Sequence, residues 1–219
     1  MYTFPDGTEP IRQGDIFRWL PKVELLLGDE GLPILTYQEE GGARVIDWFQ
    51  FIETGGYAST NVIVKPAYGI VITQDCDAGR AQNIAFCEIK PFTEIEINCK
   101  EDSKPKTVVG IVTDQSRKNQ KWYYLAPNER LGFATRMGVD FLSIFEVNRV
   151  MLDNNKDKLR LGRLCDDVAW PHFRERVAEF FRRYPYNEWY PFNTDEVHAY
   201  EERQHKPVDF FYPWQADKS

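Results

Sequence analysis

The stretch "NVIVKPAYGIVITQDCDAG", residues 61–79, decides the fold class, because a long apolar and β-branched run ends in a cluster of turn residues. Six more short runs, separated by Gly, Pro, Asn and Asp, predict further strands at 14–20, 83–92, 107–113, 121–127, 139–147 and 158–164. Seven short strands without long helices between them favour a small antiparallel barrel or sandwich over a parallel α/β sheet. We therefore expect a mainly β (α+β) protein.

The 219 residues divide into a barrel and three additions. The barrel is expected over residues 1–165, with an insertion at 23–60 that we expect to form a hairpin. In residues 166–185 apolar side chains recur at helical spacing and charged ones occupy the other face, which predicts an amphipathic helix with Pro171 in its first turn. Residues 186–219 are rich in aromatics and proline without either period. We expect this tail to lie against the barrel or against another protein.

The composition excludes several classes of protein. No run approaches the roughly 18 apolar residues of a membrane helix, and no signal-peptide pattern is present, so we expect a cytoplasmic protein without a membrane partner. The net charge of −7 disfavours broad adhesion to a phosphate backbone, although a local basic patch in the arginine-rich segment 156–183 stays open. The four cysteines are widely spaced and are expected to be reduced. Neither their spacing nor that of the histidines predicts a metal site, and no cofactor is expected.

Cys76 stands between two aspartates at the end of the predicted strand. As a nucleophile it would need a thiolate, and neighbouring carboxylates raise the pKa of a thiol. If the strand continues this far, Asp75 and Asp77 point to one face and Cys76 points to the core. We therefore expect Cys76 to be a small buried residue.

Asp75 and Asp77 leave two interpretations open. Two carboxylates separated by one residue, next to Thr73, are able to hold a hard cation or to act as acid and base on a polar substrate. The same residues are also typical of a turn, where aspartates accept hydrogen bonds from backbone amides.

Three short motifs follow one another in an order that resembles the MazF/PemK toxin family: "RQGDIFRW" at 12–19, "GIVITQD" at 69–75 and "IAFCEIKPFTE" at 84–94. The resemblance implies an SH3-like barrel with an appended helix and endoribonuclease activity. It also implies an antitoxin as the partner that covers the RNA groove.

The family's motif elements match this chain residue by residue. The matching residues are Gly14, Asp15 and Ile16, then Thr73 and Asp75, then Pro91 with Thr93. The family has an arginine before a proline at the start of the second strand, where this chain has Lys65 before Pro66. The resemblance then implies Lys65 as a phosphate ligand, Thr73 and Thr93 as hydrogen-bond donors to sugar or phosphate, and Asp75 or Asp77 as acid/base. An ammonium is not equivalent to a planar guanidinium on a phosphate. The resemblance therefore leaves open whether cleavage of RNA is retained or lost.

Two functions therefore stay open. The first is a MazF/PemK-like barrel that binds RNA or a nucleotide, as an effector of toxin or phage-defence systems. The second is a non-catalytic interaction subunit or adaptor of a larger defence or toxin–antitoxin complex, indicated by the acidic balance and the aromatic tail. The chain also resembles a set of bacterial proteins that share "GDI", "CD" and "YYLAP", a pattern that implies no activity. The sequence gives no indication of the oligomeric state.

Overall fold

The computed structural model describes residues 1–39, 42–54, 57–115, 121–182, 198, 201–203 and 205. The chain forms two units, Met1–Phe180 and Phe181–Ser219. The tail predicted at 186–219 lies outside the described residues except for the few positions near its middle, and the fold below is that of the first unit.

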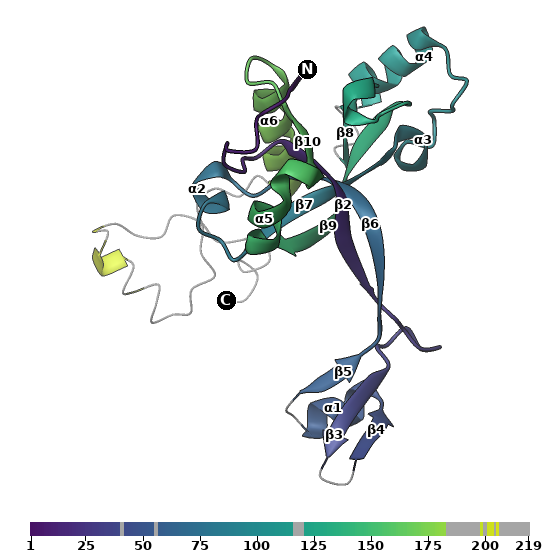
Figure 1. Ribbon diagram of the computed structural model, residues 1–219, viewed down its shortest axis with the longest axis vertical. Helices are drawn as coiled ribbons and strands as arrows, with labels where there is room; N and C mark the ends of the chain where they lie inside the picture. The colour runs from purple at the N-terminus through teal and green to yellow at the C-terminus, as the bar shows by residue number, and fades with distance from the viewer. Residues whose placement is uncertain are drawn as a thin grey trace, which may run out of the picture. The chain divides into compact units, whose positions relative to one another are not determined.

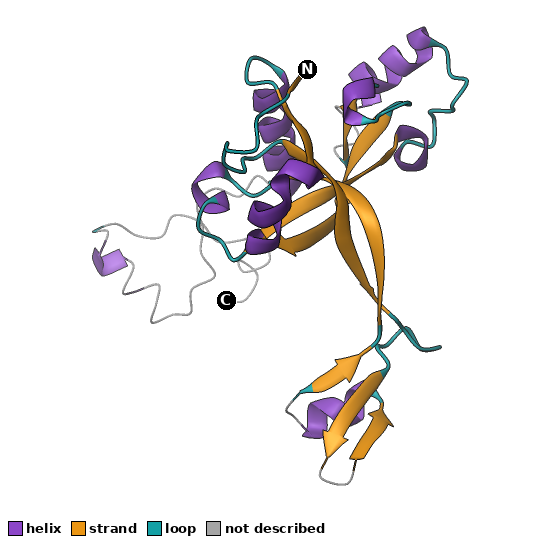
Figure 2. Ribbon diagram, viewed as in Figure 1, coloured by secondary structure: helices purple, strands orange, loops and turns teal. Residues whose placement is uncertain are grey.

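Seven strands of the described residues form one sheet in the order β1-β10-β2-β6-β7-β9-β8, and every neighbouring pair is antiparallel. Their bounds are β1 Tyr2–Thr3, β2 Asp15–Leu25, β6 Val62–Val71, β7 Asn83–Pro91, β8 Trp122–Leu125, β9 Met137–Asn148 and β10 Arg160–Leu164. The sheet is curled into a half-barrel (Figure 2). The expected mainly β, antiparallel architecture is confirmed at this level.

The two edges of the sheet are joined by a side chain. The Tyr2 hydroxyl of β1 donates a hydrogen bond of 2.8 Å to the Ala126 carbonyl, directly after β8. One face of the curled sheet holds the larger apolar core, to which Ile16, Ile70 and Val139 contribute fully buried side chains. Helix α6, Ala169–Phe181, covers this core.

Helix α6 lies within residues 166–185, where the sequence predicts an amphipathic helix, and residues 183–185 of that range lie outside the described residues. Phe173 and Val177, four residues apart, are buried in the core as the spacing predicts. Phe181, expected on the same stripe, is instead 59% exposed. None of the helices in the described part of the chain is long and apolar enough to cross a membrane.

The opposite face of the sheet carries a second core under helix α5, Arg149–Leu159, which the sequence analysis did not predict. Leu152 and Leu159 of this helix are buried against Phe86 and Phe17. The side chain of Asn148 accepts hydrogen bonds from the amides of Val150 and Met151 and caps the helix.

The strand expected at 107–113 is wrong. The chain forms helix α4, Pro105–Gly110, followed by a π-helical turn at Ile111–Gln115, after the short helix α3, Phe92–Ile95. Pro105 suits the first helical turn, and Val108 and Ile111, three residues apart, are buried with Trp122 in a third apolar cluster. The β-branched run is therefore helical because one helical face of it is buried.

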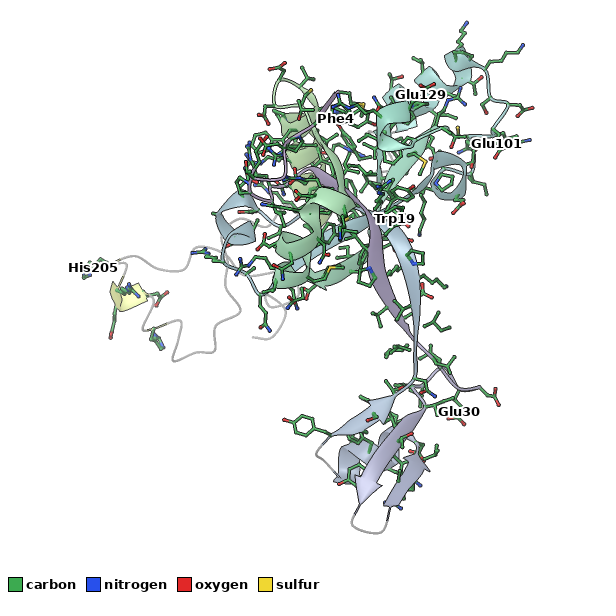
Figure 3. The ribbon with its side chains drawn as sticks, in the orientation of Figure 1. Phe4, Trp19, Glu30, Glu101, Glu129 and His205 are labelled. Carbon is green, nitrogen blue, oxygen red and sulfur yellow. The ribbon has the colours of Figure 1, made fainter. Side chains whose placement is uncertain are left out.

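Strands β2 and β6 continue together beyond the sheet (Figure 1). A bulge between Phe17 and Leu20, where Trp19 has a φ of 55°, marks the start of this extension. We call the two-stranded part, Pro21–Leu25 and Val62–Pro66, the arm. The segment 26–61 beyond it is called the tip, and Figure 3 labels Trp19 at the base of the arm and Glu30 in the tip.

The tip has its own small sheet in the order β4-β3-β5. Its elements are β3 Leu35–Glu39, β4 Gly42–Ile46, helix α1 Trp48–Thr54 and β5 Ala58–Thr60. Leu35 and Ile46 lie opposite each other in this sheet and are both buried. The expected hairpin is thus part of a three-stranded sheet with a helix, and residues 23–25 belong to β2.

Candidate functional site

The residues predicted at the end of β6 are engaged in contacts within the protein itself. The Thr73 hydroxyl accepts a hydrogen bond of 2.8 Å from the Ala85 amide of β7. Asp75 accepts one of 2.7 Å from the Gln13 amide, and its second oxygen lies 3.5 Å from Nε of Arg12. Asp75 therefore ties the loop before β2 to the end of β6 through an amide that is 62 residues away in the sequence, which is a structural contact but not the closure of a local turn.

Cys76 does not point into the core, and that prediction is wrong. The strand ends at Val71, and Asp75–Ala78 form the short helix α2, so strand alternation does not reach Cys76 and its side chain is exposed. Asp77 pairs with Arg80 at 2.6 Å. The hydrogen bond from Arg80 lowers the pKa of Asp77, so this carboxylate is ionised and paired at the surface.

Asp15, the acid of the "GDI" motif, is completely buried. It accepts hydrogen bonds from Arg163 and from Arg160, the latter at 3.2 Å, so that two guanidinium groups of β10 are bound to this first residue of β2. Arg163 also reaches Glu9 at 2.9 Å. The motif therefore supplies a structural ion cluster that joins β2, β10 and the amino-terminal loop.

The structure does not bring the five predicted site residues together. Lys65 lies in the arm, six strand residues from Val71, which is about 20 Å at the usual rise of a strand. Thr93 lies in α3 beyond the far end of β7, while Thr73 bonds to Ala85 near its start. The side chains proposed to hold one phosphate or sugar thus belong to separate regions of the sheet.

Lys65 is part of an alternating row of charges that we call the charged row. Its Nζ lies 2.7 Å from Glu24, which is 3.6 Å from Lys22, which in turn lies 2.8 Å from Glu88. The row continues through Lys90 to Asp140, at 3.3 and 3.0 Å. Three lysines thus face three carboxylates across β6, β2, β7 and β9, and the row is neutral by itself.

The other face of the arm is apolar and uncovered. The ladder places three apolar pairs directly opposite each other: Pro21 with Pro66, Val23 with Val64 and Leu25 with Val62. We call these six side chains the apolar row. Val23 and Val64 are both 56% exposed. No other strand pairs with β2 or β6 along the arm within the described residues, so the apolar row faces solvent.

Exposed apolar side chains concentrate in the arm and the tip. Thirteen of the 22 large hydrophobic side chains exposed in the described residues fall between Val23 and Val64. The tip contributes the most exposed of all, Tyr57 at 96%. A soluble protein rarely gathers apolar side chains in this way unless they form an interaction surface.

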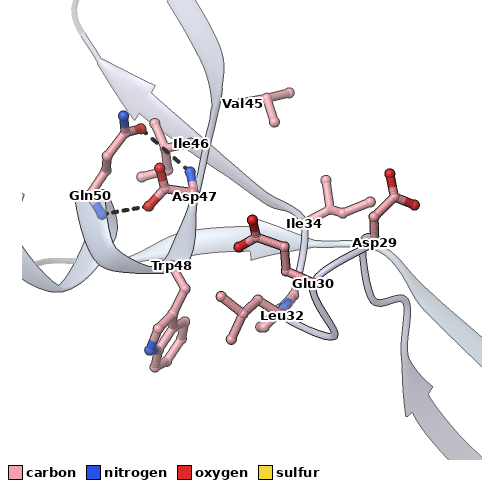
Figure 4. A pocket seen from close by; sticks show the side chains of 11 residues that line it. Asp29, Glu30, Leu32, Ile34, Val45, Ile46, Asp47, Trp48 and Gln50 are labelled. Carbon is pink, nitrogen blue, oxygen red and sulfur yellow. Dashed lines mark hydrogen bonds between the residues drawn. The ribbon is translucent and has the colours of Figure 1, made fainter.

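The tip also holds a pocket of about 530 Å³ (Figure 4). Leu32, Ile34 and Trp48 are among its apolar lining residues, and Glu30 and Asp47 are among its acidic ones. In the view of Figure 4 the two carboxylates point to one side and Leu32 and Trp48 to the other.

A smaller pocket of about 190 Å³ lies beside β8 and α6. Two of its polar side chains are bound to the protein itself: the Tyr123 hydroxyl donates to the Ala169 carbonyl, and Arg176 donates to the Trp122 carbonyl. Burial raises the pKa of Tyr123 to about 12. Among the described residues, no three His, Cys, Asp or Glu side chains gather in a way that suits a metal ion.

Comparison of the chain with models of known protein families found no match, and comparison with curated protein sequences found none. The interpretation of the site therefore rests on its geometry. The sequence analysis missed the apolar row, because the signal is shared between two distant segments. Residues 21, 23 and 25 and residues 62, 64 and 66 are apolar, but only the register shows that these six lie on one face.

Proposed function

We propose that this protein is a non-catalytic interaction subunit or adaptor, and that its arm and tip dock on a partner protein. The exposed apolar row carries the proposal. An isolated two-stranded ribbon is only marginally stable in water, and burying its apolar face against another protein would stabilise it. The opposite face of the same ribbon is already satisfied by the charged row.

The number of exposed apolar side chains supports an interaction surface. Val23, Leu25, Val62 and Val64 of the apolar row are among the thirteen large hydrophobic side chains exposed in the arm and the tip. A contiguous apolar patch of more than a few hundred Å² is uncommon on a monomer and marks an interaction site.

The partner would meet the face of the arm and not its edges. Pro21 and Pro66 stand opposite each other at the start of the arm and have no amide hydrogens to offer a further strand. The sequence resemblance implies an antitoxin as the partner, and the acidic balance and the aromatic tail indicate a larger enzyme of a defence or toxin–antitoxin complex.

The test changes the apolar row and leaves the fold intact. In Val23→Thr/Val64→Thr both residues keep a β-branched shape but lose their apolar surface. The tagged wild-type protein is used to isolate a stoichiometric partner from the native host. That partner is then purified, and its affinity for each variant is measured by calorimetry.

We expect binding to the double variant to weaken at least about tenfold. The matched control is Leu142→Thr, which removes a 63% exposed apolar side chain from β9, outside the arm. Equal affinity of the wild type and the arm variant would overturn the proposal, as would equal weakening in the control.

We also propose RNA or nucleotide binding by an SH3-like, MazF/PemK-like barrel as a second function. The observation that favours it is that the three segments carrying the resemblance are the adjacent antiparallel strands β2, β6 and β7. The separation of Lys65 from Thr73 and the pairing of Lys65 with Glu24 favour binding without cleavage.

This second function is tested by incubating the purified protein with mixed RNA, with and without magnesium. The expected result is a mobility shift that is weakened in Lys65→Ala, with the RNA left intact. No shift at any protein concentration would exclude RNA binding, and cleavage in either condition would show that endoribonuclease activity is retained.

A further inference from the structure

The tip pocket combines an apolar surface with acidic groups and contains no basic side chain among its described lining residues. Leu32, Ile34 and Trp48 supply apolar surface, and all three are at least partly accessible. Asp29 and Glu30 stand on the turn that precedes Leu32 (Figure 4). Its volume of about 530 Å³ is within the range of pockets that hold one or two large side chains.

The carboxylates of this pocket differ in what they already do. Asp47 accepts a hydrogen bond of 2.8 Å from the Gln50 amide, while the Gln50 side chain accepts one of 3.4 Å from the Asp47 amide, so Asp47 caps helix α1. Asp29 and Glu30 form no ion pair within the described residues. Their charge is therefore directed to solvent or to a ligand.

The acidity extends over the whole tip. Residues 26–61 contain six Asp or Glu and one Arg, a net charge of −5 out of −7 for the entire chain. A sixth of the sequence therefore accounts for most of the net negative charge, beside exposed apolar side chains. This combination attracts a cationic, apolar partner and repels nucleic acid or an anionic membrane surface.

We propose that the tip pocket binds a basic, apolar segment of the partner protein, with a lysine or arginine side chain seated in the pocket. The proposal rests on the proposed function and specifies the chemistry of the partner. The aliphatic stem of the basic residue packs on Leu32 and Ile34. The carboxylates of Asp29 and Glu30 pair with the charged head group.

A second copy of this chain fits the pocket poorly. A symmetric contact would place the same acidic surface on both sides, and like charges across an interface weaken it. The row of exposed apolar side chains alone does not distinguish a second copy from another protein, whereas the charge of the tip does.

The experiment uses the full chain and three fluorescent nine-residue peptides. The first alternates Arg or Lys with Leu, the second carries Glu in place of the basic residues, and the third carries Ser in place of Leu. Affinities are measured by fluorescence anisotropy at low and at high salt. We expect only the first peptide to bind, and its binding to weaken as salt rises.

Two variants locate the site. Asp29→Asn/Glu30→Gln removes two pocket charges without changing side-chain size, and we expect about five- to tenfold weaker binding of the first peptide. Glu53→Gln removes one charge from helix α1 outside the pocket lining and is expected to change the affinity less than twofold. Equal binding of the basic and acidic peptides, or equal effects of the two variants, would overturn the proposal.

The failure of this proposal differs from a failure of the proposed function. If the isolated partner loses affinity for Val23→Thr/Val64→Thr but not for Asp29→Asn/Glu30→Gln, and the basic peptide does not compete, the arm is an interface and the pocket proposal is wrong. If neither variant affects the partner, the proposed function fails as well. If light scattering shows a dimer for the wild type and a monomer for the arm variant, the occupant is a second copy of this chain. That result would overturn the proposal of a basic partner.

Discussion

The same two strands behave differently in the sheet and in the arm. Where β2 and β6 lie within the sheet, the opposite pair Ile16 and Ile70 is completely buried. Further along the same ladder, Val23 and Val64 also lie opposite each other, and each of these two side chains is 56% exposed. The residue types and the pairing are alike, and only the cover differs.

This difference shows what a strand pattern does and does not encode. β-branched pairs stabilise a ladder in either place. Their burial depends on a further element that packs on the strands, and α6 is that element for the sheet. No described element does so for the apolar row. Four predictions test this contrast between a sheet that α6 covers and an arm that no described element covers, beginning with the largest expected effect.

Asp15→Asn should destabilise the sheet most. The substitution removes the buried carboxylate that pairs with both Arg160 and Arg163 and leaves Arg163 only the partly exposed Glu9, and breaking a buried ion pair costs about 3–5 kcal/mol. Urea unfolding should give this loss with an unchanged slope. Asp77→Asn, at the surface, should change stability by less than about 0.5 kcal/mol. Similar values for the two variants would show that Asp15 is not structural.

Thr73→Val should lower the free energy of unfolding by about 1–2 kcal/mol, because the Ala85 amide loses its acceptor. Thr73→Ser keeps the hydroxyl and should restore most of the stability. The pair of variants separates a structural threonine from one that contacts RNA. If Thr73→Val keeps its stability but loses RNA binding, the residue belongs to a functional site.

The charged row should make the free energy of unfolding depend on pH. Burial alone would raise the pKa of Glu88, but hydrogen bonds from Lys22 and Ser143 outweigh it, and the net pKa is lowered. A lowered native pKa stabilises the fold above the unfolded value of 4.5, and this contribution is lost as the pH falls through the native pKa.

Glu88→Gln should therefore cost on the order of 0.5 kcal/mol near pH 7 and less near pH 3.5. Urea unfolding of both proteins at the two pH values measures the difference. An equal cost at both would show that the charge of Glu88 does not hold the arm to the sheet.

Sequence alone predicted the sheet better than the site. The strands now seen as β2, β6, β7, β8, β9 and β10 were expected because each shows a short apolar or alternating run between turn residues. The helix at 105–110 was missed because β-branched residues favour strands until a buried partner, here Trp122, selects one helical face. Helix α5 was missed although Asn148 offers a capping signal.

The candidate site was less accessible to sequence reasoning for a physical reason. A motif records which residues occur and in what order, but not how far apart the strands place them. Lys65 and Thr93 are each separated from Thr73 by the length of a strand. The apolar row has the opposite property. Its two halves are nearly 40 residues apart in sequence and meet only through the register of β2 and β6.

The smallest effect on stability is expected where the proposed function predicts the largest effect on binding. Val23→Thr/Val64→Thr should change the free energy of unfolding by less than about 0.5 kcal/mol, because neither side chain is buried by the chain itself. Ile16→Val/Ile70→Val, the matched pair in the sheet, should cost about 0.5–1.5 kcal/mol for each site, since each removes a buried methylene group.

Thermal and urea unfolding of both double variants measure this contrast directly. An arm variant as unstable as the sheet variant would mean that another part of this chain covers the apolar row in solution. The exposed pair would then be part of a core, and the case for a partner protein would lose its main support. A stable arm variant that no longer binds the partner would show that the apolar row is covered by another molecule and not by this chain.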